Sequence, residues 1–170
     1  MKPLLEMLAK GKRSQMEDLD EVLQFAFKHE AIIADLVEFS AHQQANVAAR
    51  AIWVLRKIAE TSAASLATHK RHLLNRLTQS PHWEVKAELC HIIPALSLTP
   101  AETKQAINFF ESCQNEASKI VRAWALNGLY EMSKLSPSLI PRVSGLLNEA
   151  LKSDIPSIRE RARNILKELE

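Results

Sequence analysis

The chain has 170 residues, of which 46% are hydrophobic, and its 22 basic and 20 acidic side chains leave a formal net charge of +2. This length suits one domain with a continuous core, and the charge is too balanced to argue by itself for nucleic acid as a partner. No apolar run approaches the roughly 20 residues that a membrane span needs, and the first residues lack the apolar segment of a signal peptide. Two cysteines do not make a disulfide framework, so we expect a cytoplasmic protein with reduced thiols.

Residues 1–29 form the first predicted element. Ser14-Gln15-Met16-Glu17 has the spacing of a capping box, and one helical face is formed by Leu19, Val22, Leu23 and Ala26. This segment does not match the repeat that follows it. We therefore predict an N-terminal helical cap of one or two helices.

From about residue 30 onward, an apolar pattern recurs. Segments that start at Val47, Val85, Val121 and Ile158 align without gaps, at spacings of 38, 36 and 37 residues. Apolar residues stand at positions 0, 4, 8 and 11 of each segment, which describes one buried face of an α-helix. Position 4 is occupied by Ala51, Leu89, Ala125 and Ala162. We predict that each segment is a helix and that these four side chains are buried.

A second apolar-periodic stretch precedes each of these helices, so each repeat is predicted to be an outer helix followed by an inner helix. The repeats cover approximately residues 30–64, 65–101, 102–136 and 137–170 of a single solenoid domain that spans residues 1–170. Helix starts are predicted at two capping boxes, Thr99-Pro100-Ala101-Glu102 and Ser157-Ile158-Arg159-Glu160, and at Ser80-Pro81 and Ser136-Pro137. Strand signals are missing from the sequence, so the predicted fold class is all-α.

Three inner helices open with a β-branched residue followed by a base: Val85-Lys86, Val121-Arg122 and Ile158-Arg159. With the repeat spacing, these openings resemble HEAT repeats over roughly residues 30–170. The resemblance implies a right-handed α-α superhelix of the HEAT/armadillo type, with about four helix pairs and a concave groove lined by the inner helices. It also implies that the three bases form a structural ladder with acids or carbonyls of neighbouring turns.

Positions 2, 6, 9 and 13 of each inner helix lie opposite the apolar face. Ala49, Ala87 and Ala123 make a floor there, and the candidate groove residues around it are Trp53, Arg56, His91, Asn127 and Tyr130. Exposed Trp, Tyr and Arg are enriched at binding hot spots, although the two aromatic residues could instead pack against neighbouring helices. Charges on this face and its flanks, Arg50 included, nearly cancel, which favours a protein or peptide partner over phosphates.

The favoured interpretation is a non-catalytic scaffold that binds a protein or a peptide. The sequence offers no catalytic residues, no cofactor-binding residues and no set of metal ligands. The alternative is a nucleic-acid binder similar to the HEAT-like alkylpurine DNA glycosylases, since Trp53, Glu88 and Trp124 faintly resemble their concave residues. Against this alternative, no Trp in the chain is followed four residues later by an Asp.

Overall fold

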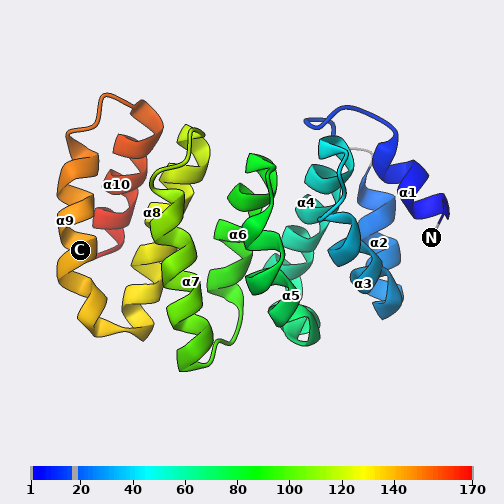
Figure 1. The fold of residues 1–170 in the computed structure, drawn as a ribbon, viewed down its shortest axis with the longest axis horizontal. Helices are drawn as coiled ribbons and strands as arrows, with labels where there is room; N and C mark the ends of the chain where they lie inside the picture. Colours follow the sequence, from blue (N-terminus) through cyan, green and yellow to red (C-terminus); the bar gives the residue numbers. More distant parts are fainter. Residues whose placement is uncertain (1, 17–18, 170) are drawn as a thin grey trace. The chain divides into compact units, whose positions relative to one another are not determined.

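The structure, a computed structural model, describes residues 2–16 and 19–169. It divides into two compact units, an N-terminal unit of residues 1–97 and a C-terminal unit of residues 98–170. Across the described residues, every regular element is an α-helix or a short 3-10 helix, which confirms the predicted all-α class (Figure 1). None of these described helices is long and apolar enough to cross a membrane. The division into four repeats of one domain stays a prediction.

The N-terminal unit is built around α4. Its α-helices are α1 (Lys2–Ala9), α2 (Asp20–Lys28), α3 (Glu30–Phe39), α4 (Ala45–Ser62), α5 (Lys70–Asn75) and α6 (Trp83–Ala95). Helix α4 packs against α3 and α6, and also against α1 and α2 of the cap. Of the predicted helical face, Leu19, Val22 and Ala26 are buried, whereas Leu23 is partly exposed. Within its described residues, the cap therefore has two helices, and both contact the first inner helix.

The predicted outer helix before α6 is broken into three short pieces. These are the 3-10 helix η2 (Ala63–His69), α5 and the 3-10 helix η3 (Leu77–Gln79). The apolar residues of this stretch, Leu66, Leu73 and Leu77 among them, are nevertheless fully buried. Residues three apart lie on nearly the same face in both helix types, so the apolar spacing alone does not distinguish a continuous α-helix from this interrupted one.

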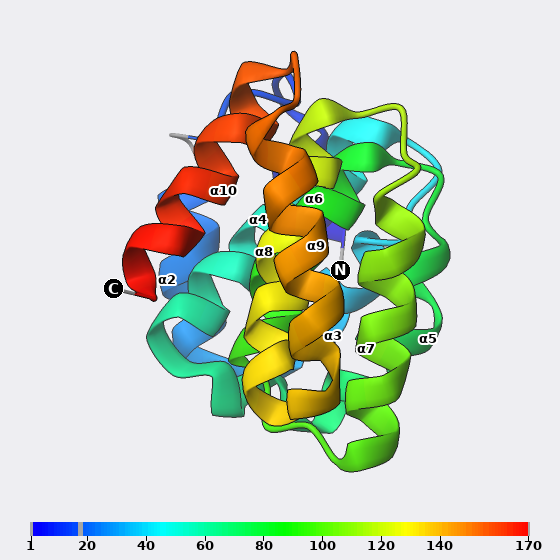
Figure 2. The same cartoon turned by 90° about the vertical axis from the view of Figure 1, so that its left-hand side faces the viewer.

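The C-terminal unit contains two helix pairs. Its elements are α7 (Pro100–Cys113), α8 (Lys119–Leu135), the 3-10 helix η4 (Pro137–Leu139), α9 (Ile140–Leu151) and α10 (Pro156–Glu168). Helix α8 packs against α7 and α10, and α9 packs against α10; Figure 2 shows α9 and α10 side by side. Inner helices thus pack directly against each other, α4 on α6 in one unit and α8 on α10 in the other.

The predicted register of the inner helices is confirmed. Ala51, Leu89, Ala125 and Ala162 are all fully buried. A small residue at position 4 of three inner helices lets neighbouring helices approach closely, because a larger side chain there would need room that a close-packed core does not have. The apolar period therefore identified the buried face correctly in both units.

The predicted helix starts were right at one capping box and wrong at two other places. Thr99 Oγ1 accepts a hydrogen bond from the Glu102 amide at 3.3 Å, and Glu102 Oε2 accepts one from the Thr99 amide at 2.8 Å. Helix α10 instead begins at Pro156, whose fixed φ suits the first helical position, so Ser157 lies inside the first turn. At Ser80, the side-chain oxygen accepts a bond from the His82 amide, and α6 begins only at Trp83.

The two remaining predicted starts have different outcomes. Ser136-Pro137 does begin a helix, the 3-10 helix η4. The capping box proposed at Ser14-Gln15-Met16-Glu17 ends on a residue that lies outside the described part of the chain. A serine before a proline thus marks a helix start at Ser136 but not at Ser80, where α6 begins only at Trp83.

Candidate functional site

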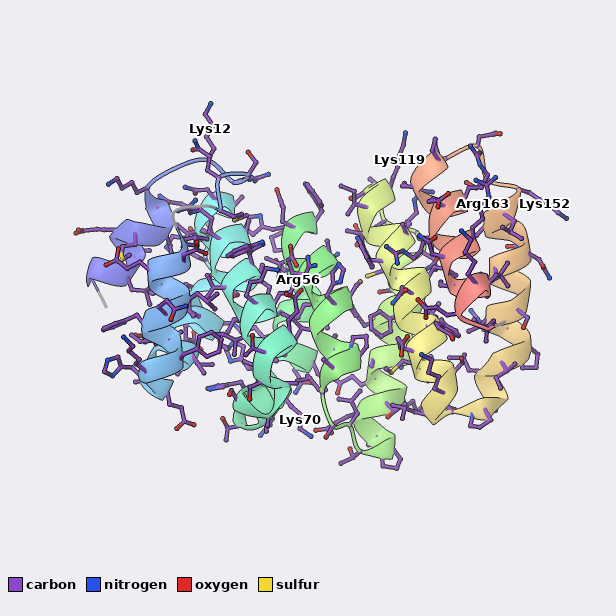
Figure 3. The ribbon with its side chains drawn as sticks, turned by 180° about the vertical axis from the view of Figure 1, so that it is seen from behind. Lys12, Arg56, Lys70, Lys119, Lys152 and Arg163 are labelled. Atoms are coloured by element: carbon purple, nitrogen blue, oxygen red, sulfur yellow. The ribbon has the colours of Figure 1, made fainter. Side chains whose placement is uncertain are left out.

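The candidate groove residues of the N-terminal unit lie on α4 and α6. Trp53 and Arg56 are three residues apart on α4, and His91 comes from α6; all three are partly exposed. Figure 3 shows Arg56 where α4 and α6 run side by side. We call the surface of these two helices around Trp53, Arg56, Lys57, Glu60, Glu88 and His91 the α4/α6 face.

Arg56 joins the two helices of this face. Its Nη1 donates to Glu88 Oε2 of α6 at 3.1 Å, and its Nε donates to Glu60 Oε1 one turn further along α4 at 2.8 Å. Burial alone would lower the pKa of Arg56, but the two carboxylates outweigh burial and raise it. The guanidinium is therefore a bridge within the face, with two acidic partners already in place.

Trp53 is bordered by a second cation of the same face. Lys57 Nζ lies 5.6 Å from the centre of the Trp53 ring and 2.8 Å from Glu60 Oε2. The two bases of the α4/α6 face, Arg56 and Lys57, are thus matched by the two acids, Glu60 and Glu88. The result is a partly exposed indole in a surface whose charges neutralise each other.

The Glu88 carboxyl has a raised pKa. Burial raises it, and the attraction and hydrogen bond from Arg56 compensate only in part. Between the unfolded pKa and the folded pKa, the folded chain holds a proton that the unfolded chain has released, so stability falls as pH rises through this window. The Arg56–Glu88 ion pair therefore does not fully offset the burial of the carboxylate.

We expect Glu88→Gln to melt at the wild-type temperature or above it at pH 7. The amide keeps the shape and an acceptor oxygen for Arg56 without burying a charge. The difference in Tm should shrink as pH falls toward about 4, where the wild-type carboxyl is protonated. Thermal melting followed by circular dichroism across this pH range measures it, and a clearly lower Tm at pH 7 would contradict the interpretation.

Glu60→Gln is the matched control, and its change in Tm at pH 7 should have the opposite sign to that of Glu88→Gln. Burial would raise the pKa of Glu60, but hydrogen bonds from Lys57 and Arg56 outweigh it and the pKa is lowered. Such a carboxylate stabilises the fold above its unfolded pKa and loses this contribution as pH falls through the folded pKa. Glu60→Gln should therefore lower the Tm at pH 7 and not at acid pH, and only slightly, because Glu60 is well exposed.

In the C-terminal unit, the two candidate residues differ in accessibility. Asn127 is partly exposed, but Tyr130 is only 6% exposed and has Lys134 Nζ 4.4 Å from its ring centre. Helix α8 has α7 and α10 as neighbours, so less of its surface stays open than a single helical wheel suggests. The three alanines that were predicted to form the floor of the groove, Ala49, Ala87 and Ala123, are buried as well.

A pair that the sequence analysis did not select is Trp124 of α8 with Arg161 of α10. The Arg161 guanidinium carbon lies 3.6 Å from the centre of the Trp124 ring, and burial lowers the pKa of Arg161. Both residues stand at position 3 of their inner helices, so aligning that position across repeats could have found the pair. The Arg56–Glu88 bridge, by contrast, joins position 9 to position 3. The repeat positions that contact each other between neighbouring inner helices therefore depend on the length of the side chains as well as on the repeat.

Comparison with known proteins identifies the family. The family model described as HEAT repeat domain matches residues 6–169. The chain belongs to the HEAT repeat family. The predicted resemblance is confirmed, and the match also takes in most of the N-terminal cap, which the sequence analysis had set apart from the repeats. The similarity to alkylpurine DNA glycosylases stays a prediction.

The solved structures that match this HEAT-repeat chain include the crystal structure of an engineered protein. It is 17% identical in sequence, with a TM-score of 0.61, and the match covers 97% of this chain and 77% of that chain. At this identity the likeness concerns the fold alone, an all-α solenoid. No curated protein matches the chain. HEAT repeat domains are in general helical-repeat scaffolds that mediate protein interactions rather than enzymes.

Arg50, which was counted among the charges of the predicted groove and its flanks, does not lie on an open surface. Its side chain is fully buried, and its guanidinium donates to the backbone carbonyls of Met7 at 3.3 Å, Lys12 at 3.5 Å and Gln15. The guanidinium carries five N–H donors, and backbone carbonyls are suitable acceptors for them. Arg50 therefore holds the N-terminal segment onto α4 and belongs to the core of this HEAT-repeat chain.

One member of the predicted basic ladder bonds to a carbonyl, as the HEAT resemblance implies. Arg159 Nη1 donates to the backbone carbonyl of Ser153 at 2.5 Å, across the turn between α9 and α10. In the preceding repeat, Arg122 is partly buried. Arg159 is therefore committed to a turn of its own repeat.

Among the described residues, no group of three or more His, Cys, Asp or Glu could hold a metal ion.

Proposed function

We propose that this chain is a non-catalytic scaffold that binds a peptide or a protein surface along its inner helices. The observation that carries the proposal is the α4/α6 face, where a partly exposed Trp53 stands among charges that cancel each other. Aromatic rings offer a large contact area at low entropic cost, and hot spots are enriched in Trp. A face without excess positive charge has little to gain from phosphates. Two buried cysteines, Cys90 and Cys113, do not make a disulfide framework, and we propose a cytoplasmic location.

Affinity capture from the native cell tests the proposal. We expect Trp53→Ala to lose the partner of the wild-type chain while its helical content and Tm stay close to wild type. Truncation of a hot-spot residue costs about 2 kcal/mol or more, roughly thirtyfold in affinity. Quantitative mass spectrometry of the captured proteins measures the loss.

Trp83→Ala is the matched control. Trp83 is 40% exposed at the first residue of α6, at the helix end rather than on the α4/α6 face. This variant should capture the same partner as the wild type. Equal capture by Trp53→Ala, or loss of its fold, would contradict the proposal.

Duplex DNA provides the second arm of the test. With balanced charge on the α4/α6 face, we expect at most weak, salt-sensitive and sequence-independent binding. Submicromolar binding at physiological salt, or excision of alkylated bases, would overturn the scaffold proposal. Glu88 would then be the first residue to substitute in a catalytic test.

A further inference from the structure

A hollow of about 400 Å³ opens in the C-terminal unit, between the end of α8 and the beginning of α7. Four apolar residues line it, Leu98, Pro100, Ile107 and Leu135, together with Thr103, Lys104 and Ser136. This volume lies within the range of natural ligand pockets, which combine apolar walls with a few polar groups. The hollow is therefore large enough to receive a side chain of a partner.

Among the leucine and isoleucine side chains of this lining, Leu135 is the most exposed to water. It is the last residue of α8 and 58% of it is exposed, whereas Leu126 and Leu129 of the same helix are buried. Covering such a side chain removes apolar surface from water, which favours association. Ile107 and Leu98 beside it are also partly exposed. The wall is suited to an aliphatic side chain from outside.

Lys104 is the charged residue of the lining. It is exposed, and no acidic side chain in the described part of the chain pairs with it. The nearest acid in the sequence, Glu102, uses Oε2 to accept a hydrogen bond from the Thr99 amide at 2.8 Å. The ammonium group of Lys104 therefore remains available to a carboxylate of a ligand.

Two hollows of the N-terminal unit are less suited to the same ligand. One, of about 480 Å³, has Glu30 in its lining together with Lys28. The other, of about 200 Å³, contains Lys70, whose Nζ already donates to the Ser97 carbonyl at 2.7 Å. Of these three hollows, the one in the C-terminal unit has a large exposed aliphatic side chain, Leu135, and a lysine, Lys104, with no acid in the same lining.

We propose that this hollow docks a short segment of a partner protein in which an aliphatic side chain stands next to a carboxylate. The aliphatic group covers Leu98, Ile107 and Leu135, and the carboxylate pairs with Lys104, which fixes the orientation and excludes basic segments. The inference rests on the proposed function, because it requires a protein-binding scaffold. It adds a docking site at the helix ends of the C-terminal unit, separate from the α4/α6 face of the N-terminal unit.

Selection from a library of random peptides displayed on phage, against the immobilised full chain, tests this inference. We expect enriched peptides to carry an aliphatic residue beside Asp or Glu. Fluorescein-labelled copies of them are then titrated by fluorescence anisotropy. The variant Lys104→Glu/Leu135→Asp should weaken their binding by about tenfold or more, and added salt should weaken binding to the wild type. Both positions are exposed, so the variant should melt like the wild type.

Lys119→Glu/Ile120→Asp is the matched control. It makes the same change of charge and polarity at two exposed positions on the first turn of α8, at the opposite end of the helix from Leu135; Figure 3 shows Lys119 there. This variant should bind the peptides within about threefold of the wild type.

The outcomes separate this inference from the proposed function. Peptides that lose affinity for Trp53→Ala but bind Lys104→Glu/Leu135→Asp like the wild type would leave the scaffold proposal standing and overturn the second docking site. Enrichment of Lys-rich or Arg-rich peptides would also overturn it. If no peptide is enriched above background, both proposals fail.

Discussion

Ala125→Asp should lower the free energy of unfolding by about 3 kcal/mol or more, because a carboxylate without a partner would be buried. Ala125 is fully buried in the middle of α8, the helix that packs against both α7 and α10. No water can reach the new charge without separating these helices. Chemical denaturation followed by circular dichroism at pH 7 measures the loss, and a variant as stable as the wild type would refute the register of the inner helices.

Ala101→Asp is the control for this substitution. Ala101 is exposed in the first turn of α7. An acidic side chain there faces water and the positive end of the helix dipole, so stability should stay within about 0.5 kcal/mol of the wild type or rise slightly. The contrast between the two variants separates the effect of burial from that of adding an aspartate to a helix.

Gly128→Ala should destabilise the protein by about 1–3 kcal/mol, although alanine is the better helix former. A Cβ built on Gly128 of α8 would lie 2.5 Å from Cε1 of the Phe110 ring on α7. Phe110 is fully buried, so its ring has no free space to move into. The glycine is needed here because two helices pack together with an aromatic ring between their backbones. Denaturant melting measures the loss.

Two further variants test that explanation. Gly145→Ala changes another helical glycine, on α9, whose added Cβ would meet nothing within 4 Å; it should stabilise the protein by about 0.5–1 kcal/mol. In the second test, Phe110→Leu is combined with Gly128→Ala. The smaller side chain makes room for the Cβ, so the double variant should lose less stability than the sum of the losses of the two single variants. Full additivity would show that the ring is not the obstacle.

The sequence by itself determined the helical class, the family and the buried face of each inner helix. Positions 0, 4, 8 and 11 repeat because a helix with 3.6 residues per turn needs an apolar residue at each of them to cover one side. That is a local property, so it can be read from spacing, as Ala51 and Ala125 show. The Thr99–Glu102 capping box was equally readable because its partners are three residues apart.

The tertiary structure alone decided which polar and aromatic side chains stay accessible. Arg50 is buried because its acceptors, the carbonyls of Met7, Lys12 and Gln15, come from a segment at least 35 residues earlier in the chain. Tyr130 is covered because α8 has neighbours on more than one side, which a helical wheel of one helix does not include.

The same reason applies to the candidate binding surfaces. The composition of the α4/α6 face was visible in the sequence as nearly balanced charges. The Arg56–Glu88 bridge was not, because it joins residues 32 apart at unequal repeat positions. The hollow beside Lys104 likewise depends on Leu135, which lies on a different helix. Such contacts are set by how helices pack and how far side chains reach across them, and periodicity along one helix carries no information about either.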